Sequence, residues 1–240
     1  MGEDRSRGQA PQSVLTELPK SAAHQRGAFF GRRKGHKLRK QQAGLYEELL
    51  PKLSLNIAQA PPRDLASLFP FKPEQLQLEI GFGGGEHLLH EARNHPSTGL
   101  IGCEPFINGM AKMLAVIANE KIQNIRLFAS DALYLLEWLP AASLDRIDIL
   151  YADPWPKKRH WKRRFISDEN VARFARVLKP GGTLRFASDS GSCARKIFTG
   201  WPRKPMTGVC PIRTGRAPVT SKRRSVRAGN RPIWSSAGPE

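Results

Sequence analysis

The sequence predicts an α/β fold built on a doubly wound, mostly parallel β-sheet. Between Gln75 and Ala187, short apolar segments alternate with longer segments in which apolar residues recur at helical spacing. A glycine-rich stretch from Gly81 to Gly85 follows the first apolar segment, and acidic residues stand at the ends of several of them. Repeated strand–helix alternation gives parallel strands with right-handed crossovers and helices on both faces of the sheet.

Five segments are predicted as strands because they are short, apolar and bounded by turn residues. They are Gln75–Ile80, Thr98–Cys103, Ile125–Ala129, Arg146–Ala152 and Thr183–Ala187. Four helices are predicted between them: Glu86–His95, Phe106–Glu120, Asp131–Leu139 and Asp168–Leu178. Ser130 or Asp131 is expected to cap the third helix, and Lys179 to Gly182 to end the fourth. The pattern is that of a Rossmann-like fold.

The rest of the chain divides by composition. Residues 1–26 are polar and rich in turn formers, so we expect a disordered N-terminal tail. Residues 27–70 form a basic N-terminal extension, with a short helix over Gln41–Leu50 that stops at Pro51. The regular domain spans 71–198. Residues 199–240 are rich in Arg, Pro and Gly without an apolar period, so the fold is expected to lack further C-terminal strands.

The charge of the chain favours a polyanionic partner. The formal net charge is +18, and the basic residues cluster in segments outside the apolar pattern. The N-terminus has no apolar core for a signal peptide, and no segment approaches the ~20 apolar residues that span a bilayer. The three cysteines have no disulfide or metal-ligand spacing, and Cys103 is expected in the core. We therefore expect a cytoplasmic protein, a monomer, with no membrane partner.

Acids at successive strand ends surround the glycine-rich stretch. Glu79 precedes it, while Glu104 and Asp131 follow the second and third predicted strands. An acid one strand after a glycine loop can bind ribose hydroxyls, and Asp131 could accept a hydrogen bond from an adenine amino group. Because the loop lacks a Lys-Ser/Thr phosphate motif, a phosphate-poor nucleoside such as S-adenosylmethionine fits best. The alternative is a tight turn with helix-capping acids.

A second candidate site begins at Asp153. The carboxylate follows a predicted strand, and Pro154, Trp155 and Pro156 then lead into a cationic run from Lys157 to Arg164. Open α/β sheets bind ligands at the carboxyl ends of their strands. Lys and Arg interleaved with aromatic residues suit a phosphate backbone with stackable bases. A solvated charged loop with a packed tryptophan is the alternative interpretation.

Two further features are less specific. Ser188 and Asp189 end the fifth predicted strand, where a carboxylate could accept hydrogen bonds from guanine N1–H and its amino group, or cap a following helix. His87 and His90 lie three residues apart on a predicted helix without a third ligand nearby. We expect surface or capping roles for both histidines and no metal site.

These motifs together resemble the bacterial tRNA (guanine-N7-)-methyltransferases. The shared segments, in family order over roughly residues 27–198, are Gly31–Gly35, Glu79–Gly83, Gly102–Phe106, Ser130–Ala132, Ala152–His160 and Ser188–Asp189. The resemblance implies a class I methyltransferase fold and transfer of a methyl group from S-adenosyl-L-methionine to N7 of the guanosine at tRNA position 46.

The resemblance also implies residue roles. Glu79, Gly81, Glu104, Asp131 and Asp153 would contact S-adenosyl-L-methionine, with Asp153 at the reaction centre. Lys157 and Asp189 would contact the substrate guanosine. The RNA-binding residues would be Arg159, His160, Trp161, Lys162, Arg163 and Arg164.

The tail departs from the family pattern. The family's C-terminal Thr-Arg/Lys-Tyr/Phe-Glu motif has no counterpart after Gly200, as a shifted reading frame would produce. Two alternatives to the implied activity follow. The chain could be an RNA-binding protein inactivated by loss of that motif, or a methyltransferase acting on another nucleobase.

Overall fold

The described part of the chain forms an open parallel sheet. The computed structural model describes residues 31–153, 155 and 157–187. Within them, five strands pair in the order β3-β2-β1-β4-β5, and every pairing is parallel. The strands are β1 (Gln75–Ile80), β2 (Thr98–Cys103), β3 (Ile125–Phe128), β4 (Leu144–Leu150) and β5 (Leu178–Ala187). The order reverses between β1 and β4, which is where such sheets bind ligands.

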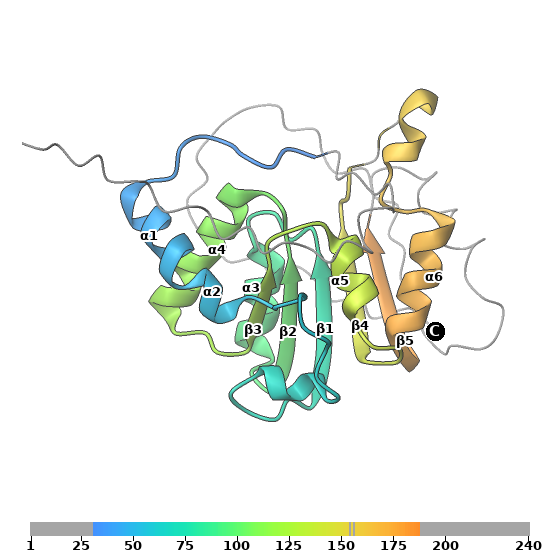
Figure 1. The fold of residues 1–240 in the computed structure, drawn as a ribbon, viewed down its shortest axis with the longest axis horizontal. Helices are drawn as coiled ribbons and strands as arrows, with labels where there is room; N and C mark the ends of the chain where they lie inside the picture. The colour runs from blue at the N-terminus through green and yellow to red at the C-terminus, as the bar shows by residue number, and fades with distance from the viewer. Residues whose placement is uncertain (1–30, 154, 156, 188–240) are drawn as a thin grey trace, which may run out of the picture.

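Helices cover both faces of the sheet, which confirms the predicted fold class (Figure 1). The helices α3 (Glu86–Asn94) and α4 (Ile107–Glu120) pack on one face around a cluster that includes Met110 and Leu114. On the other face, α5 (Ala132–Trp138) and α6 (Asp168–Val177) enclose a second cluster with Leu135 and Phe174 at its centre. Both clusters exclude water, and their burial supplies most of the driving force for folding.

The N-terminal extension packs beside α4. It contains α1 (Lys40–Glu48), α2 (Leu50–Leu53) and a 3₁₀ turn, η2 (Leu65–Leu68). The prediction that Pro51 ends the first helix was wrong, because Pro51 lies in the first turn of α2. Proline is tolerated there, since an N–H at that position has no partner within the helix.

Boundaries of three predicted strands were also wrong. β3 ends at Phe128 rather than Ala129, and β4 begins at Leu144 rather than Arg146. β4 ends at Leu150 rather than Ala152, because Tyr151 takes a left-handed backbone conformation (φ 57°) that breaks the extended run.

β5 begins at Leu178 rather than Thr183, so it includes the Lys179–Gly182 segment that was expected to end the helix before it. Leu178 pairs with Leu144 of β4, and the register then shifts before Thr183 pairs with Arg146. Gly181, with φ 81°, lies within this irregular part of the strand. The turn residues of this segment indicated an irregular backbone, but they did not predict that it pairs with β4.

Several predictions concern residues beyond the described ranges. Residues 1–26, which were expected to be disordered, lie outside the described residues. So do Asp189 and residues 199–240, where no further strands were expected. Among the helices that are described, none combines the length and apolar character needed to cross a bilayer.

Candidate functional site

A cavity of about 610 Å³ opens at the carboxyl ends of the strands. Its walls come from the ends of β1, β2 and β4, from the start of α5, and from the segment that joins β4 to α6. Of the predicted site residues, Gly81, Glu104, Asp131, Asp153, Lys162, Arg163 and Arg164 all line it. The fold therefore brings both candidate sites of the sequence into one cavity.

Glu104 is fixed by the backbone around the cavity. Its Oε2 accepts a hydrogen bond from the Gly83 N–H at 2.7 Å, and its Oε1 accepts one from the Phe106 N–H at 2.8 Å. Burial raises the pKa of this carboxyl, the two backbone N–H groups lower it, and the nearby charge of Asp153 raises it again. Each carboxylate oxygen retains a second lone pair, so Glu104 can still accept hydrogen bonds from a ligand.

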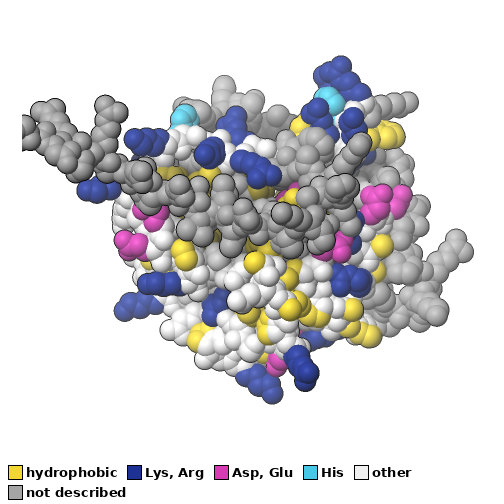
Figure 2. Space-filling model, in the orientation of Figure 1, with side chains coloured by type: hydrophobic (Ala, Val, Ile, Leu, Met, Phe, Trp, Pro, Cys, Tyr) yellow, Lys and Arg dark blue, Asp and Glu magenta, His cyan; other side chains and the backbone are white. Residues whose placement is uncertain are grey.

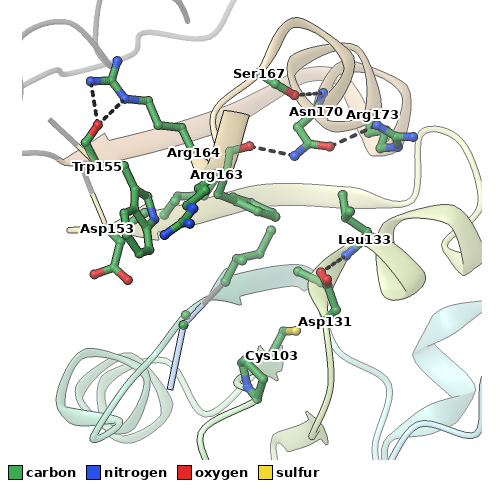
Figure 3. A pocket seen from close by; sticks show the side chains of 18 of the residues that line it. Cys103, Asp131, Leu133, Asp153, Trp155, Arg163, Arg164, Ser167, Asn170 and Arg173 are labelled. Atoms are coloured by element: carbon green, nitrogen blue, oxygen red, sulfur yellow. Dashed lines mark hydrogen bonds between the residues drawn. The ribbon is translucent and has the colours of Figure 1, made fainter. Parts of the chain in front are cut away.

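Asp131 stands at the end of the next strand and is 5% exposed. Its Oδ1 accepts a hydrogen bond from the Leu133 N–H at 3.0 Å, which makes it the N-cap of α5. Burial raises the pKa of Asp131, while the Leu133 N–H and the positive charge of Arg33 lower it. Figure 3 shows Asp131 across the cavity from Trp155 and Arg163. The second oxygen remains available to a ligand.

Gly81 provides room for a ligand beside these acids. Its φ is 74°, and a side chain built at this position would meet no atom within 4 Å. A residue with a Cβ would be strained here and would project into the open space of the cavity. The cavity volume, the two buried acids at adjacent strand ends and this unfilled space together fit a nucleoside-sized cofactor such as S-adenosyl-L-methionine.

Glu79 is placed differently from the other predicted cofactor ligands. Its Oε2 lies 2.7 Å from His87 Nδ1 on α3, and Glu79 is not among the residues that line the cavity. Side chains alternate along β1, so Ile80 enters the cluster under α5 while Glu79 faces α3. Burial raises the pKa of Glu79, against the lowering effect of His87.

Glu79 belongs to a group of buried and partly buried charges between α3 and the sheet, which we call the α3 cluster. It contains three carboxylates, two guanidinium groups and one imidazole: Glu79, Glu91, Asp148, Arg146, Arg185 and His87. The expectation of a surface or capping role for His87 was wrong. Its side chain is 22% exposed, and its Nε2 lies 2.6 Å from Arg185 Nη2.

Asp153 lies at the rim, where the chain leaves β4. It is exposed and lines the cavity. Burial is the main cause of the raised pKa of Glu104, and the charge of Asp153 adds to it. Tyr151 and Trp155 flank it with φ values of 57° and 37°, conformations that non-glycine residues seldom adopt. Strained backbone of this kind concentrates at functional sites.

The cationic run folds into a 3₁₀ helix, η3 (Lys158–Arg163), beside the cavity. Arg163 lies over the Trp155 ring, 5.0 Å from its centroid, and His160 meets the same ring edge-on. Both Arg164 Nε and Nη2 donate to the Trp155 carbonyl at 3.3 Å (Figure 3). The Arg164 guanidinium also lies over the Trp161 ring. The tryptophans therefore hold part of the cationic run against the cavity.

Other cations of the run are exposed to solvent. Arg159 and Lys162 are exposed, and Lys157, the N-cap of η3, is exposed as well. Figure 2 shows Lys and Arg side chains along the upper edge of the molecule, where η3 and the strand ends lie in Figure 1. Within the described residues, no group of three or more His, Cys, Asp or Glu side chains could hold a metal ion.

The structure adds residues to this site that sequence reasoning missed. Tyr151 lines the cavity from the end of β4, Asn170 and Arg173 line it from α6, and Gly31 reaches it from the N-terminal extension. Tyr151 could have been noticed as an aromatic residue beside the key acid. No local pattern distinguishes Asn170 or Arg173, because their helix shows only ordinary amphipathic spacing.

Comparison with known proteins identifies the family. Residues 73–218 match the family model Methyltransf_4, described as "Putative methyltransferase", and this range runs beyond the predicted domain end at residue 198. A tRNA (guanine-N(7)-)-methyltransferase of Agrobacterium fabrum is 57% identical over 175 residues, covering 73% of this chain and 75% of the relative. A relative of the same name from Rhizobium meliloti is 59% identical over 165 residues, covering 69% of this chain and 71% of the relative. Another from Rhodopseudomonas palustris (strain BisB5) is 49% identical over 229 residues, covering 89% of both. The chain therefore belongs to the tRNA (guanine-N(7)-)-methyltransferase family, which uses S-adenosyl-L-methionine as its methyl donor.

Proposed function

We propose that this protein transfers a methyl group from S-adenosyl-L-methionine to N7 of a guanosine in tRNA. The observation that carries the proposal is the continuity of the cavity with the cationic helix η3. A single segment leads from β4 through Asp153 and Trp155 into η3, and both its ends line the same cavity. A cofactor held by the strand-end acids and an RNA held by η3 would therefore meet at Asp153.

The cofactor side of the site would be formed by strand-end acids. Glu104 would accept hydrogen bonds from ribose hydroxyls, and Asp131 from the adenine amino group. Gly81 would let the backbone approach the ligand. Glu79 would contact the cofactor if its carboxylate turned away from His87. Otherwise it would act indirectly, by holding the start of the glycine-rich loop that follows it. When bound, S-adenosyl-L-methionine supplies an electrophilic methyl group on a positively charged sulfur.

Asp153 would act by orientation and charge rather than as a base. Guanine N7 has an in-plane lone pair and carries no proton, so no residue has to remove one before the methyl group is transferred. An exposed carboxylate at the rim can instead orient the base and stabilise the positive charge of the reacting groups. Positioning and preorganised electrostatics are the terms that such a site can supply.

The substrate side would follow from the family pattern. Lys157 and Asp189 would contact the guanosine, and Arg159, His160, Trp161, Lys162, Arg163 and Arg164 would hold the RNA. We place the modified guanosine at tRNA position 46 and the enzyme, as a metal-free monomer, in the cytoplasm, where its substrate is found. Size-exclusion chromatography with light scattering would test the monomer directly.

Nucleoside analysis tests the activity. Bulk tRNA from cells that carry the gene should contain 7-methylguanosine, and tRNA from a deletion strain should lack it. Purified protein should methylate a tRNA transcript with guanosine at position 46 and leave a transcript with adenosine at that position unmodified. Methylation of both transcripts would overturn the assignment of position 46. Methylation of neither would overturn the proposed activity.

A second candidate is a protein that binds RNA without transferring methyl groups. The atypical tail after Gly200 favours it, since the C-terminal family motif is absent from the sequence. Calorimetry with S-adenosyl-L-methionine distinguishes the two, because a pure RNA binder would release no heat. Resequencing the gene tests the shifted-frame hypothesis, and an intact frame would contradict it.

A further inference from the structure

The basic segment of residues 31–37, which we call the strap, crosses the carboxyl ends of the strands (Figure 1). Gly31 lines the cavity, and Arg33 lies close enough to Asp131 for its charge to lower the pKa of that carboxyl. The strap is exposed along most of its length and contains no helix or strand. Contacts from elsewhere must therefore hold it in this place.

Those contacts come from the first turn of α4. The Ile107 N–H donates to the Arg33 carbonyl at 2.9 Å. The Asn108 side chain completes the attachment: its Oδ1 accepts from the Gly35 N–H at 2.7 Å, and its Nδ2 donates to the His36 carbonyl at 2.7 Å. A side-chain amide used in this way bonds the N–H of one residue and the carbonyl of the next.

Gly35 makes this attachment possible. A Cβ at position 35 would lie 2.8 Å from Asn108 Oδ1 and 3.1 Å from Phe106 Cζ. Any larger residue would therefore push the strap away from the amide. This explains a glycine within an otherwise cationic segment.

The same turn is tied to the cofactor side of the cavity. Glu104 accepts hydrogen bonds from both the Phe106 N–H and the Gly83 N–H, so the chain entering α4 is bonded to the glycine-rich loop. Asn108 lies two residues further along the same turn. The strap and the glycine-rich loop are thus connected through α4.

We propose that Asn108 is a positioning residue that holds the strap as the outer wall of the cofactor cavity and couples strap order to cofactor binding. This inference rests on the proposed function for the identity of the ligand, but not for the attachment itself. Since coupling is reciprocal, a cofactor that binds best with the strap in place must also favour the attached strap.

Limited trypsin digestion, followed by mass spectrometry at Arg32, Arg33 and Lys34, tests the attachment in the full chain. Losing the two hydrogen bonds of the Asn108 side chain, each of typical net strength, should raise the detached population about tenfold or more. Asn108→Ala should therefore increase strap cleavage by about that factor without ligand, and Gly35→Ala should do the same by displacing the strap. Because both changes break the same attachment, the double variant should be cleaved no faster than either single variant.

Asn124 provides a matched control. Its Nδ2 donates to the carbonyls of Ala92, His95 and Thr98, far from the strap in the chain. Asn124→Ala should lower the unfolding midpoint while leaving strap cleavage unchanged. Asn108→Ala should instead raise strap cleavage and leave the unfolding midpoint unchanged.

Ligand addition tests the coupling. S-adenosyl-L-methionine should slow strap cleavage in the unchanged protein, and Asn108→Ala should weaken its calorimetric Kd several-fold. Strap cleavage in Asn108→Ala and Gly35→Ala at the unchanged rate would overturn the attachment. An unchanged Kd in both variants would overturn the coupling. If the protein bound no cofactor at all, the proposed function would fail, while cleavage without ligand would still decide the attachment.

Discussion

Two groups of buried acids lie along the same sheet, and their hydrogen-bond partners set them apart. Glu104 and Asp131, at the cavity, are held by backbone N–H groups and keep lone pairs for a ligand. Glu79, Glu91 and Asp148, in the α3 cluster, are bonded to the side chains of His87, Arg146 and Arg185. All five acids are under 10% exposed.

The difference concerns charge as well as geometry. A carboxylate held by neutral N–H groups keeps its negative charge, which can act on a cationic ligand; Asp131 also lies near the charge of Arg33. The charge of a carboxylate bonded to a guanidinium group is largely balanced by that group, so less of it acts on a ligand. Burial alone therefore does not identify a binding acid, and the partner of the acid is the more informative observation.

Removing the exposed acid at the cavity rim should have the largest effect. Asp153→Ala should lower kcat for methyl transfer by about two to three orders of magnitude, because the variant lacks a preorganised charge at the reaction centre. Single-turnover kinetics with saturating cofactor would measure it. Asp168→Ala, an exposed acid in the first turn of α6, is a control that should retain activity. Near-normal turnover of Asp153→Ala would refute its assignment.

The comparison itself can be tested with one pair of substitutions. Glu104→Gln should weaken the calorimetric Kd for S-adenosyl-L-methionine by about tenfold or more, the value of a hydrogen bond to a charged group. Glu79→Gln should affect cofactor affinity less and thermal stability more, since it breaks the contact with His87. The reverse ranking would make Glu79 the direct cofactor ligand that the family resemblance implies.

The same contrast applies to cations. Arg146 and Arg185 are bonded to carboxylates in the α3 cluster, whereas Arg159 and Lys162 are exposed on η3. Replacing Arg159 and Lys162 together by Gln should weaken tRNA binding. It should also reduce the slope of log K against log salt by about 0.7 to 0.9 for each phosphate that the variant no longer binds. Binding titrations at several salt concentrations measure this slope.

A matched pair of lysines controls for net charge in that experiment. Lys72 precedes β1 and Lys121 precedes β3, so both lie at the amino ends of strands, away from the cavity. Replacing both by Gln removes the same charge as the η3 variant does. An equal reduction of the slope in the two variants would show that only net charge matters.

The smallest expected effect is on stability in the α3 cluster. The three carboxylates exceed the two guanidinium groups by one charge, which a second proton on His87 would balance. Burial lowers the pKa of His87, but its hydrogen bond to Glu79 and the charges of Glu79, Asp148 and Glu91 outweigh burial and raise it. Protonation would require the Arg185 N–H to turn away from Nε2, which limits the gain.

The sign of the pH dependence follows from that raised pKa. A pKa that is higher in the folded state stabilises the protein below the ordinary pKa of about 6.5, and this stability is lost as the pH rises through the folded value. The free energy of unfolding should therefore fall between about pH 6 and pH 8 by more in the unchanged protein than in His87→Gln. Urea denaturation at both pH values measures this difference, and parallel curves would count against a raised pKa.

Local patterns were sufficient for the order and type of the elements in the sheet. Apolar runs and helical spacing are properties of neighbouring residues, so β1, β2, α4 and α6 were placed within about a residue of their observed ends. Of the two residues expected to cap α5, Ser130 and Asp131, the structure shows that Asp131 does so. The predicted burial of Cys103 is confirmed. The predicted element boundaries were wrong at Pro51 and at Lys179. At such positions the same residue can either end an element or lie within the next one.

The amino-acid sequence by itself determined the parallel α/β fold, the family and the acids and cations that carry its motifs. Only the tertiary structure decided which of those side chains meet. Side-chain alternation in β1 and the pairing of His87 direct Glu79 to the α3 cluster, while Glu104 and Asp131 reach the cavity. Likewise, Asn108 meets Gly35 across 73 residues of chain. Such contacts depend on strand register and helix packing, which a periodic pattern along the chain does not encode.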